Sequence, residues 1–417
     1  MHKTVLVRCS GRPWGSSSHL NKTRSFWCPS SRRWYGKGRS KERQEADPSR
    51  GWEILSTKKA TFTPIKPSKG GLKPPRLAHN LEKLTLKRGV TPIRDPVTQE
   101  YNFPPFLRSI PSLEDVDPII LSGFVPPSKD EKLQNLGKMH GQRFVSSTSS
   151  MTALLTQLFF LITNRSEIAT PLTSKKMRHE TNRFVRYLLQ PISISITYPN
   201  DIAVVETDSG GVDLPETEDE NVLSPLGHLM ELMLTTPKEE FQAFLRSPSK
   251  ETSKSTPSPT LRTSAYHYAK MANILIRSQL DCYSPYLSGF TFDLKSRAAL
   301  AIRMDPANYM LHQGYELSTR TGPFNSFERE YHDMARSTMI KYALQARLGA
   351  MDGVFVAYHN TRDIFGFQYI SVREMDKSVM GSHDMGNRVF QLTMTLMSKI
   401  MTRLTERFPK QEFILTV

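Results

Sequence analysis

The chain has 417 residues and a formal charge of +16, from 56 Lys or Arg against 40 Asp or Glu, and 38% of its residues are hydrophobic. This hydrophobic content excludes a chain that is disordered throughout, and the length fits one large domain or two smaller ones. The most apolar run, residues 151–162, contains Thr and Gln and is shorter than the ~20 apolar residues that a membrane-spanning helix needs. The sequence therefore contains no transmembrane segment, and membrane association would be peripheral.

The amino-terminal segment differs from the rest of the chain in charge. Residues 1–41 contain ten Lys or Arg and no acidic residue, with Ser, Trp, Phe and Leu between the basic positions. This composition predicts a mitochondrial transit peptide that is cleaved within 25–45, and the alternative is a basic arm that binds nucleic acid. Cys9 and Cys28 lie in this leader, so Cys282 is the only cysteine of the mature chain. A disulfide framework and a cysteine-based zinc site are excluded.

The next elements lie in a Pro-rich segment and in the first half of the predicted domain. Residues 42–140 are rich in Pro, Lys and Gly, which predicts a basic, extended, partly ordered lead-in, followed by one compact domain over 141–417. A Ser/Thr-capped apolar run predicts a helix over 151–162, and residues 193–198 and 202–208 predict a β-hairpin. Short helices are expected at 226–234 and 237–246, followed by a disordered insertion at 246–262.

The second half of the domain is richer in aromatic and apolar residues. We predict a helix at 265–278, a short strand at 279–283, one or two strands within 289–304 and a long helix at 328–348. Strands at 353–360 and 364–370 and a helix at 391–408 complete the chain. This order predicts an α/β fold with a mixed central sheet flanked by helices.

The candidate chemistry centres on the sequence Phe292-Asp293-Leu294-Lys295. Side chains alternate along a strand, so Asp293 and Lys295 share one face. Asp281 lies twelve residues earlier, which suits a strand-turn-strand connection, and Glu231 lies on an amphipathic helix. Carboxylates are suitable ligands for Mg²⁺ or Mn²⁺, and a lysine two residues after a ligand can orient a water molecule or stabilise hydroxide. Taken alone, the pattern also fits an ordinary salt-bridged strand.

Basic and aromatic residues around these positions have two interpretations each. Arg277, Arg297, Arg303 and Arg336 suit phosphate or RNA contacts, with Arg297 first, or they form ion pairs with Glu328, Glu330 and Asp333. Arg329, Lys341 and Gln345 lie on the predicted long helix and can also face phosphates. Tyr266, Tyr268 and Tyr283 can stack on unpaired bases, although packing is the default interpretation. The lone histidines His267 and His359 favour structural roles.

Several long segments resemble the fungal mitochondrial PET one-two-seven family of RNA-processing proteins. They include AYHYAKMANILIRSQLDCY, FDLKSRAALAIRMD and FEREYHDMARSTMIKYALQARLGAMDGVFVAYHN, and the resemblance covers about 143–408. It implies a PD-(D/E)XK restriction-endonuclease-like fold, 5′-end processing and 5′-to-3′ exoribonucleolytic turnover of transcripts. It also implies a location on the matrix side of the inner membrane and an association with mitochondrial RNA polymerase.

Matched by position, the resemblance assigns the family's acids to Asp281, Asp293 and Glu231, its lysine to Lys295, and a place lining the site to Gln279. Leu280 stands where the superfamily has proline. Family members usually continue beyond the point where this chain stops, so either the sequence is truncated or this member is shorter. We therefore predict a metal-dependent exoribonuclease acting on single-stranded RNA. The alternatives are a non-catalytic RNA-binding or polymerase-associated scaffold, and a DNA nuclease of the same fold.

Overall fold

The computed structural model describes residues 3–6, 62–65, 73–116, 125–169, 172–208, 222–245 and 264–417. Apart from the backbone of Lys3–Leu6, the predicted transit peptide lies outside these residues, and so does the predicted insertion at 246–262. Both assignments stay predictions.

The larger of two sheets has eight strands in the order β1-β13-β5-β6-β4-β8-β7-β2. Their bounds are β1 Lys3–Leu6, β2 Thr63–Ile65, β4 Phe144–Ser147, β5 Ser193–Thr197, β6 Ala203–Thr207, β7 Ala265–Met271, β8 Ile274–Leu280 and β13 Phe413–Thr416. β4 pairs in parallel with β6 and β8, whereas β5 with β6 and β7 with β8 form antiparallel hairpins. The sheet is therefore mixed, and the predicted β5–β6 hairpin is confirmed.

The smaller sheet has five strands in the order β3-β12-β11-β10-β9. Their bounds are β3 Thr91–Pro92, β9 Cys282–Tyr283, β10 Thr291–Ala298, β11 Gly353–His359 and β12 Ile364–Ser371. β10 is parallel to β11 and antiparallel to β9. The predicted α/β class with helices flanking a mixed sheet is confirmed, although the described chain forms two sheets rather than one.

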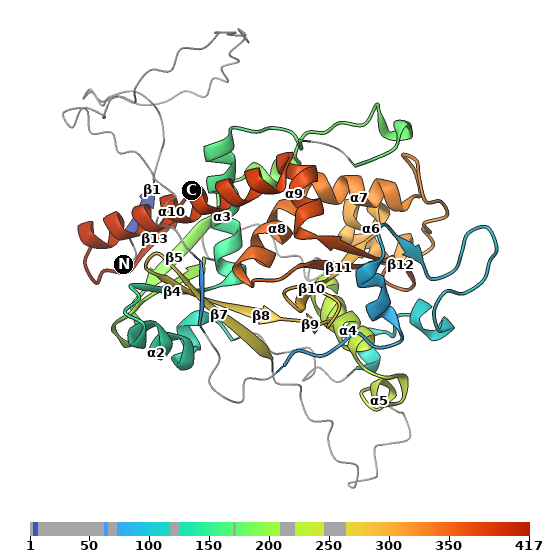
Figure 1. Ribbon diagram of the computed structural model, residues 1–417, viewed down its shortest axis with the longest axis horizontal. Coiled ribbons are helices and arrows are strands. Elements are labelled where there is room, and N and C mark those ends of the chain that lie inside the picture. Colours follow the sequence, from blue (N-terminus) through green and yellow to red (C-terminus); the bar gives the residue numbers. More distant parts are fainter. Residues whose placement is uncertain are drawn as a thin grey trace.

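Helices surround both sheets (Figure 1). Their bounds are α2 Glu131–Met139, α3 Thr148–Thr163, α4 Leu223–Thr235, α5 Lys238–Gln242, α6 Leu300–Met304, α7 Phe327–Arg336, α8 Met339–Leu348, α9 Val372–Met380 and α10 His383–Arg407. One large core joins both sheets, since it contains Ile276 of β8 and Val356 of β11 together with Leu155 of α3 and Leu344 of α8. The opposite face of the five-stranded sheet packs against α4.

The lead-in is more ordered than the sequence predicts. Leu81, Ile93 and Leu107 are fully buried and belong to the same core as Phe292 and Phe355 of the five-stranded sheet. This segment contains short 3-10 helices, Leu81–Leu86 and Pro105–Arg108, and the strand β3. Its prolines remove regular periodicity from the sequence, but its Leu and Ile side chains still provide apolar surface to bury.

The helix predicted at 265–278 is wrong, because β7 and β8 form a hairpin there. Met271 pairs with Ile274 across a two-residue turn in which Ala272 has a φ of 53°. Tyr266, Tyr268 and the β-branched residues of β8 favour a strand, and this preference outweighs the helix-like spacing. The helix predicted over 328–348 is divided into α7 and α8 at Ser337, whose φ and ψ are −120° and −75°. The helices at the ends of the domain, α3 and α10, are confirmed.

Candidate active site

Asp293 and Lys295 lie on one face of β10, as their spacing predicts. Asp293 is 1% exposed, and its Oδ2 lies 2.6 Å from Lys295 Nζ. This contact is ionic rather than a well-aligned hydrogen bond, since Asp293 Oδ2 has no partner of acceptable hydrogen-bond geometry. Burial lowers the pKa of Lys295, but the charges of Asp293 and Asp281 outweigh burial and raise that pKa above its ordinary value. The lysine is held as a cation beside the carboxylate.

Asp281 lies between β8 and β9 and reaches the same centre. Its Oδ2 accepts a hydrogen bond from the backbone N–H of Leu294 at 3.0 Å, which ties it to β10. Burial, followed by the negative charges of Asp293 and Glu231, raises the pKa of Asp281 well above its ordinary value. The structure therefore concentrates carboxylates at the junction between the two sheets.

Glu231 approaches this centre from α4. Its Oε2 lies 3.6 Å from Nδ1 of His228, one helical turn earlier. The carboxylate of Glu231 raises the pKa of His228 above its ordinary value, although burial and the charge of Lys295 oppose this, so His228 also belongs to the electrostatic environment of the site. His228 is not among the residues predicted above, although its three-residue spacing from Glu231 on a helix is a recognisable signal.

The donor set fits a hard divalent cation. Asp281 and Asp293 provide oxygen ligands, and the buried Oδ2 of Asp293 has no hydrogen-bond partner. Within the described residues, no three His, Cys, Asp or Glu side chains are already arranged around one metal position. Mg²⁺ usually binds one or two carboxylates and keeps several waters, so a pair of carboxylates such as Asp281 and Asp293 is compatible with its coordination.

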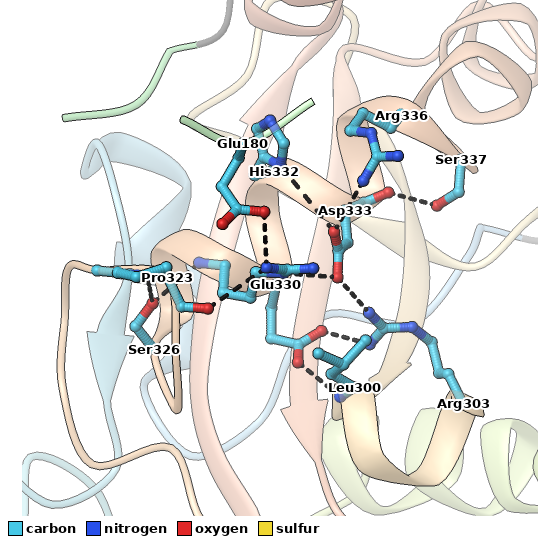
Figure 2. Close-up of polar contacts among 12 residues, drawn as sticks. Glu180, Leu300, Arg303, Pro323, Ser326, Glu330, His332, Asp333, Arg336 and Ser337 are labelled. Atoms are coloured by element: carbon cyan, nitrogen blue, oxygen red, sulfur yellow. Dashed lines mark hydrogen bonds and ion pairs between the residues drawn. The ribbon is translucent and has the colours of Figure 1, made fainter. Parts of the chain in front are cut away.

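The arginines near the site form an ion-pair network between β10, α6 and α7. Figure 2 shows the part that joins α6 to α7. Glu330 is fully buried, forms an ion pair with Arg303 and lies 3.7 Å from Nε of Arg297. Asp333 contacts Arg303 at 3.2 Å and Arg336 at 3.4 Å. The sequence left open whether these arginines contact phosphates or form ion pairs, and in the structure they form ion pairs. Arg297 keeps a buried Nε that has no hydrogen-bond partner.

The remaining basic candidates on the helices make contacts of their own. Arg329 pairs with Glu180 at 2.9 Å and with Asp333 at 3.1 Å. Nζ of Lys341 lies 5.9 Å from the ring centre of Tyr187. These side chains are partly exposed, so the phosphate role proposed for them stays a prediction.

The three remaining predicted site residues are Arg277, Gln279 and Gln345, and their surroundings differ. Arg277 is buried and pairs with Asp130, and its guanidinium lies 4.8 Å from the ring centre of Tyr266. The exposed Gln279 lies on β8 two residues before Asp281. Half-buried Gln345 lies on α8, one turn after Tyr342, whose ring centre is 5.7 Å from Lys295 Nζ. Arg277 therefore has a structural partner, whereas Gln279 and Gln345 stay predictions.

The lone histidines have structural surroundings. The ring of His267 stacks on Phe62, and burial lowers the pKa of His267. His359 is 1% exposed and its Nδ1 accepts a hydrogen bond from the backbone N–H of Thr361.

Among the described residues, no helix is long and apolar enough to cross a membrane.

Comparison with known proteins identifies relatives of the chain. The family described as "Mitochondrial protein Pet127" matches residues 124–402. The "mRNA degradation protein pet127, mitochondrial" of Schizosaccharomyces pombe is 38% identical over 341 residues, which are 81% of this chain and 64% of that protein. The "Putative mitochondrial translation system component PET127" of Saccharomyces cerevisiae is 34% identical over 337 residues, 75% of this chain and 39% of that protein. The chain thus spans less than two thirds of either relative.

Solved structures show a more distant likeness. Dxo1 of K. lactis, in complex with manganese, is 11% identical with a TM-score of 0.40, covering 83% of this chain and 80% of that one. Rai1 of Candida albicans, in complex with pU5-Mn2+, is 10% identical with a TM-score of 0.38, covering 87% and 89%. The sequence matches settle the family, and the chain belongs to the mitochondrial Pet127 family.

Proposed function

We propose that the chain is a metal-dependent ribonuclease whose PD-(D/E)XK-type centre consists of Asp281, Asp293 and Lys295, with Glu231 as a further acid. One observation carries the proposal. Asp293 and Lys295 share a face of β10 with 2.6 Å between their charged atoms, and Asp281 binds the backbone N–H of the residue between them. An ordinary surface salt bridge between Asp293 and Lys295 would not need Asp281 beside it, because the two carboxylates repel each other.

The chemistry follows from this arrangement. Asp281 and Asp293 would hold Mg²⁺ or Mn²⁺, and Glu231 is the proposed third carboxylate, which would have to move towards them when the ion binds. A bound divalent cation supplies positive charge to the phosphodiester and lowers the pKa of a bound water. The Lys295 ammonium adds a second positive charge on the same side, where it stabilises negative charge that develops on the phosphate oxygens. Glu231, with His228 beside it, adds negative charge from the side of α4.

The substrate class is proposed from the family. The Schizosaccharomyces pombe relative carries the name of a mitochondrial mRNA degradation protein, which favours RNA over DNA as the substrate. We propose 5′-end processing and 5′-to-3′ turnover of single-stranded RNA in the mitochondrial matrix. Arg297, two residues after Lys295 on the same face of β10, is the proposed contact to the 5′ phosphate, for which it would have to leave its 3.7 Å ion pair with Glu330. A mitochondrial RNA polymerase partner and a peripheral contact with the inner membrane rest on the family resemblance.

The test is degradation of a 5′-monophosphorylated single-stranded RNA by the full chain, with Mg²⁺ and with EDTA. Asp293→Asn and Lys295→Met are expected to reduce the rate by about 1000-fold or more, since each removes a charge that acts on the transition state. Asp115→Asn, at an exposed aspartate of the lead-in, is the matched control and keeps full activity. RNA binding in EDTA should survive in all three variants.

Substrate comparisons separate the finer parts of the proposal. Faster cleavage of RNA than of DNA supports the ribonuclease assignment, and a requirement for the 5′ phosphate that Arg297→Met removes supports the role of Arg297. RNA binding by the unmutated chain without any Mg²⁺- or Mn²⁺-dependent cleavage would contradict the enzyme proposal and favour the scaffold alternative.

A further inference from the structure

The loop that joins the two aspartates carries exposed aromatic side chains. Residues 284–290 connect β9 to β10 and so link Asp281 to Asp293 along the chain. Tyr286 and Phe290 in this loop are 50% and 49% exposed. The ring of Phe290 stacks on that of Tyr283, with centroids 6.0 Å apart and planes 21° from parallel. A pair of nearly parallel rings therefore lies beside the carboxylates in sequence.

Strand pairing places the ring of Tyr283 on the same face as the carboxylates. Tyr283 pairs with Thr291, and Cys282 pairs with Phe292. Cys282 and Phe292 are fully buried in the core beneath the sheet, so alternation turns Tyr283 to the opposite face, which Thr291 shares with Asp293. Thr291 and Asp293 are separated by ~7 Å along the strand, close to the spacing of successive nucleotides in an extended single strand.

The position of Phe290 is fixed by its surroundings. The N–H of Ser284 donates to the carbonyl of Phe290 at 2.8 Å, which closes the loop. Asp352 accepts hydrogen bonds from the backbone of Gly289 at 2.8 Å and from the hydroxyl of Ser288 at 2.7 Å. A Cβ on Gly289 would lie 2.9 Å from Oδ2 of Asp352, so a side chain at this position would push the carboxylate away from the loop. The loop holds its rings in a defined place.

Holding Phe290 in this way has a conformational cost. Its φ is 64°, in the left-handed region, which costs a bulky residue ~1–2 kcal/mol. The ring remains half exposed, so this cost is not offset by full burial. Strained, exposed residues of this kind concentrate at binding and catalytic sites. Arg76, whose backbone bridges to Tyr283, forms an ion pair with Glu82 next to the rings, so its charge there is compensated.

We propose that Tyr283 and Phe290 form a stacking platform for an unpaired nucleobase of the RNA, next to the phosphate that lies at Asp281 and Asp293. This proposal rests on the proposed ribonuclease function and deepens it. Every nucleobase has a π-face, so the platform tolerates any sequence but requires that the base be unpaired. The rings would thus select single-stranded substrate and place one nucleotide relative to the carboxylates.

The test measures binding of a 5′-phosphorylated oligoribonucleotide to the full chain in EDTA, with 2-aminopurine placed at each of the first nucleotides in turn. Phe290→Leu and Tyr283→Leu are expected to weaken binding by about 5- to 100-fold and to abolish the fluorescence quenching at one position. Phe290→Gly, which the left-handed backbone accepts, gives the same loss without a risk to folding. Phe324→Leu, at an aromatic residue that is 78% exposed on another loop, is the matched control and keeps wild-type binding.

An abasic nucleotide at the quenched position supplies the decisive comparison. It should remove the difference between the unmutated chain and Phe290→Leu, and a difference that persists would overturn the proposal, because the ring would then act through the fold. Unchanged RNA binding in both leucine variants would also overturn it. Ring-dependent binding by a chain that cleaves no RNA would support the platform and contradict only the nuclease function.

Discussion

The carboxylate of Asp281 accepts a hydrogen bond from the backbone N–H of Leu294, the residue between Asp293 and Lys295, at 3.0 Å. This bond joins the end of β8 to the middle of β10, although the two strands belong to different sheets. The two halves of the site are thus connected by one short link through the backbone. Because the neighbouring charges of Asp293 and Glu231 oppose ionisation of Asp281, the proposed metal-binding role and the stability of the fold place opposite demands on this residue.

Asp281→Asn should separate these two demands. Asparagine keeps an oxygen that accepts from Leu294 N–H but removes a negative charge beside Asp293 and Glu231. We expect loss of RNA cleavage together with a Tm in EDTA that is raised by about 1 to 3 °C, since electrostatic repulsion is relieved. Differential scanning calorimetry measures the shift, and Asp115→Asn serves as the control. A lower Tm would mean that the ionised carboxylate stabilises the fold, contrary to the pKa direction.

His359 predicts a loss of stability in mild acid. Burial, assisted by the nearby charge of Arg303, lowers the pKa of His359 from 6.5 to about 3. Because the unfolded chain binds this proton first, the contribution of the neutral ring is complete above about pH 6.5 and is lost as pH falls towards the folded-state pKa. The free energy of unfolding should fall by about 1.4 kcal/mol per pH unit within this window.

Urea unfolding at pH 7, 6 and 5 checks this pH dependence. His359→Gln should be less stable at pH 7, because it disrupts the hydrogen bond from Thr361. Its free energy of unfolding should, however, fall less steeply as the pH is lowered. His179→Gln, at an exposed histidine, should keep the slope. Equal pH dependence of the free energy of unfolding in the unmutated chain and in His359→Gln would show that protonation of this histidine does not affect stability.

Glu330 should be important for stability. It is fully buried, accepts from the backbone N–H of Leu300 at 2.6 Å and supplies negative charge to Arg303 and Arg297. Glu330→Ala leaves these arginines without that charge, and we expect a loss of about 3 to 5 kcal/mol in the free energy of unfolding, measured in urea. Glu330→Gln should lose less, because it keeps an acceptor for Leu300. A loss below about 1 kcal/mol in the alanine variant would contradict the structural role of the network.

Gly386 lies against a second buried ion pair. A Cβ at this position would lie 2.6 Å from the carboxylate of Asp376 and 2.7 Å from Nη2 of Arg347. Asp376 is fully buried and also contacts His383 at 2.6 Å, so it has little freedom to move away. We expect Gly386→Ala to destabilise the fold by about 1 to 3 kcal/mol. Gly314→Ala, where a Cβ meets nothing within 4 Å, is the control for thermal unfolding, and an equal Tm in both variants would refute this explanation.

The sequence predicts the central part of the site because that part is local. Alternation along one strand is enough to place Asp293 and Lys295 on one face, and a strand-turn-strand connection is enough to bring Asp281 near them. The partners of Arg297 and Arg303 could not be predicted, since Glu330 comes from a helix that only tertiary packing brings to β10. From sequence alone, the charged residues of that helix are equally compatible with phosphate contacts and with ion pairs.

The errors in the fold have a similar cause. Residues 265–278 have helix-like apolar spacing, yet pairing of β8 with β4 stabilises a strand that the local pattern does not reveal. The segment 73–116 lacks periodicity, and only its buried contacts with the five-stranded sheet show that it belongs to the core. Both errors arise where residues far apart in sequence determine local structure.

The pairing of Thr91 in β3 with Phe367 in β12 has a consequence for how the chain folds. The two residues are separated by most of the chain, so a polypeptide that emerges with its amino terminus first cannot complete this sheet until Phe367 has emerged. Contacts of such long range slow folding. Until then Leu81, Ile93 and Leu107 are without their buried surroundings, and the newly made chain exposes an apolar segment that a chaperone or a protease can recognise.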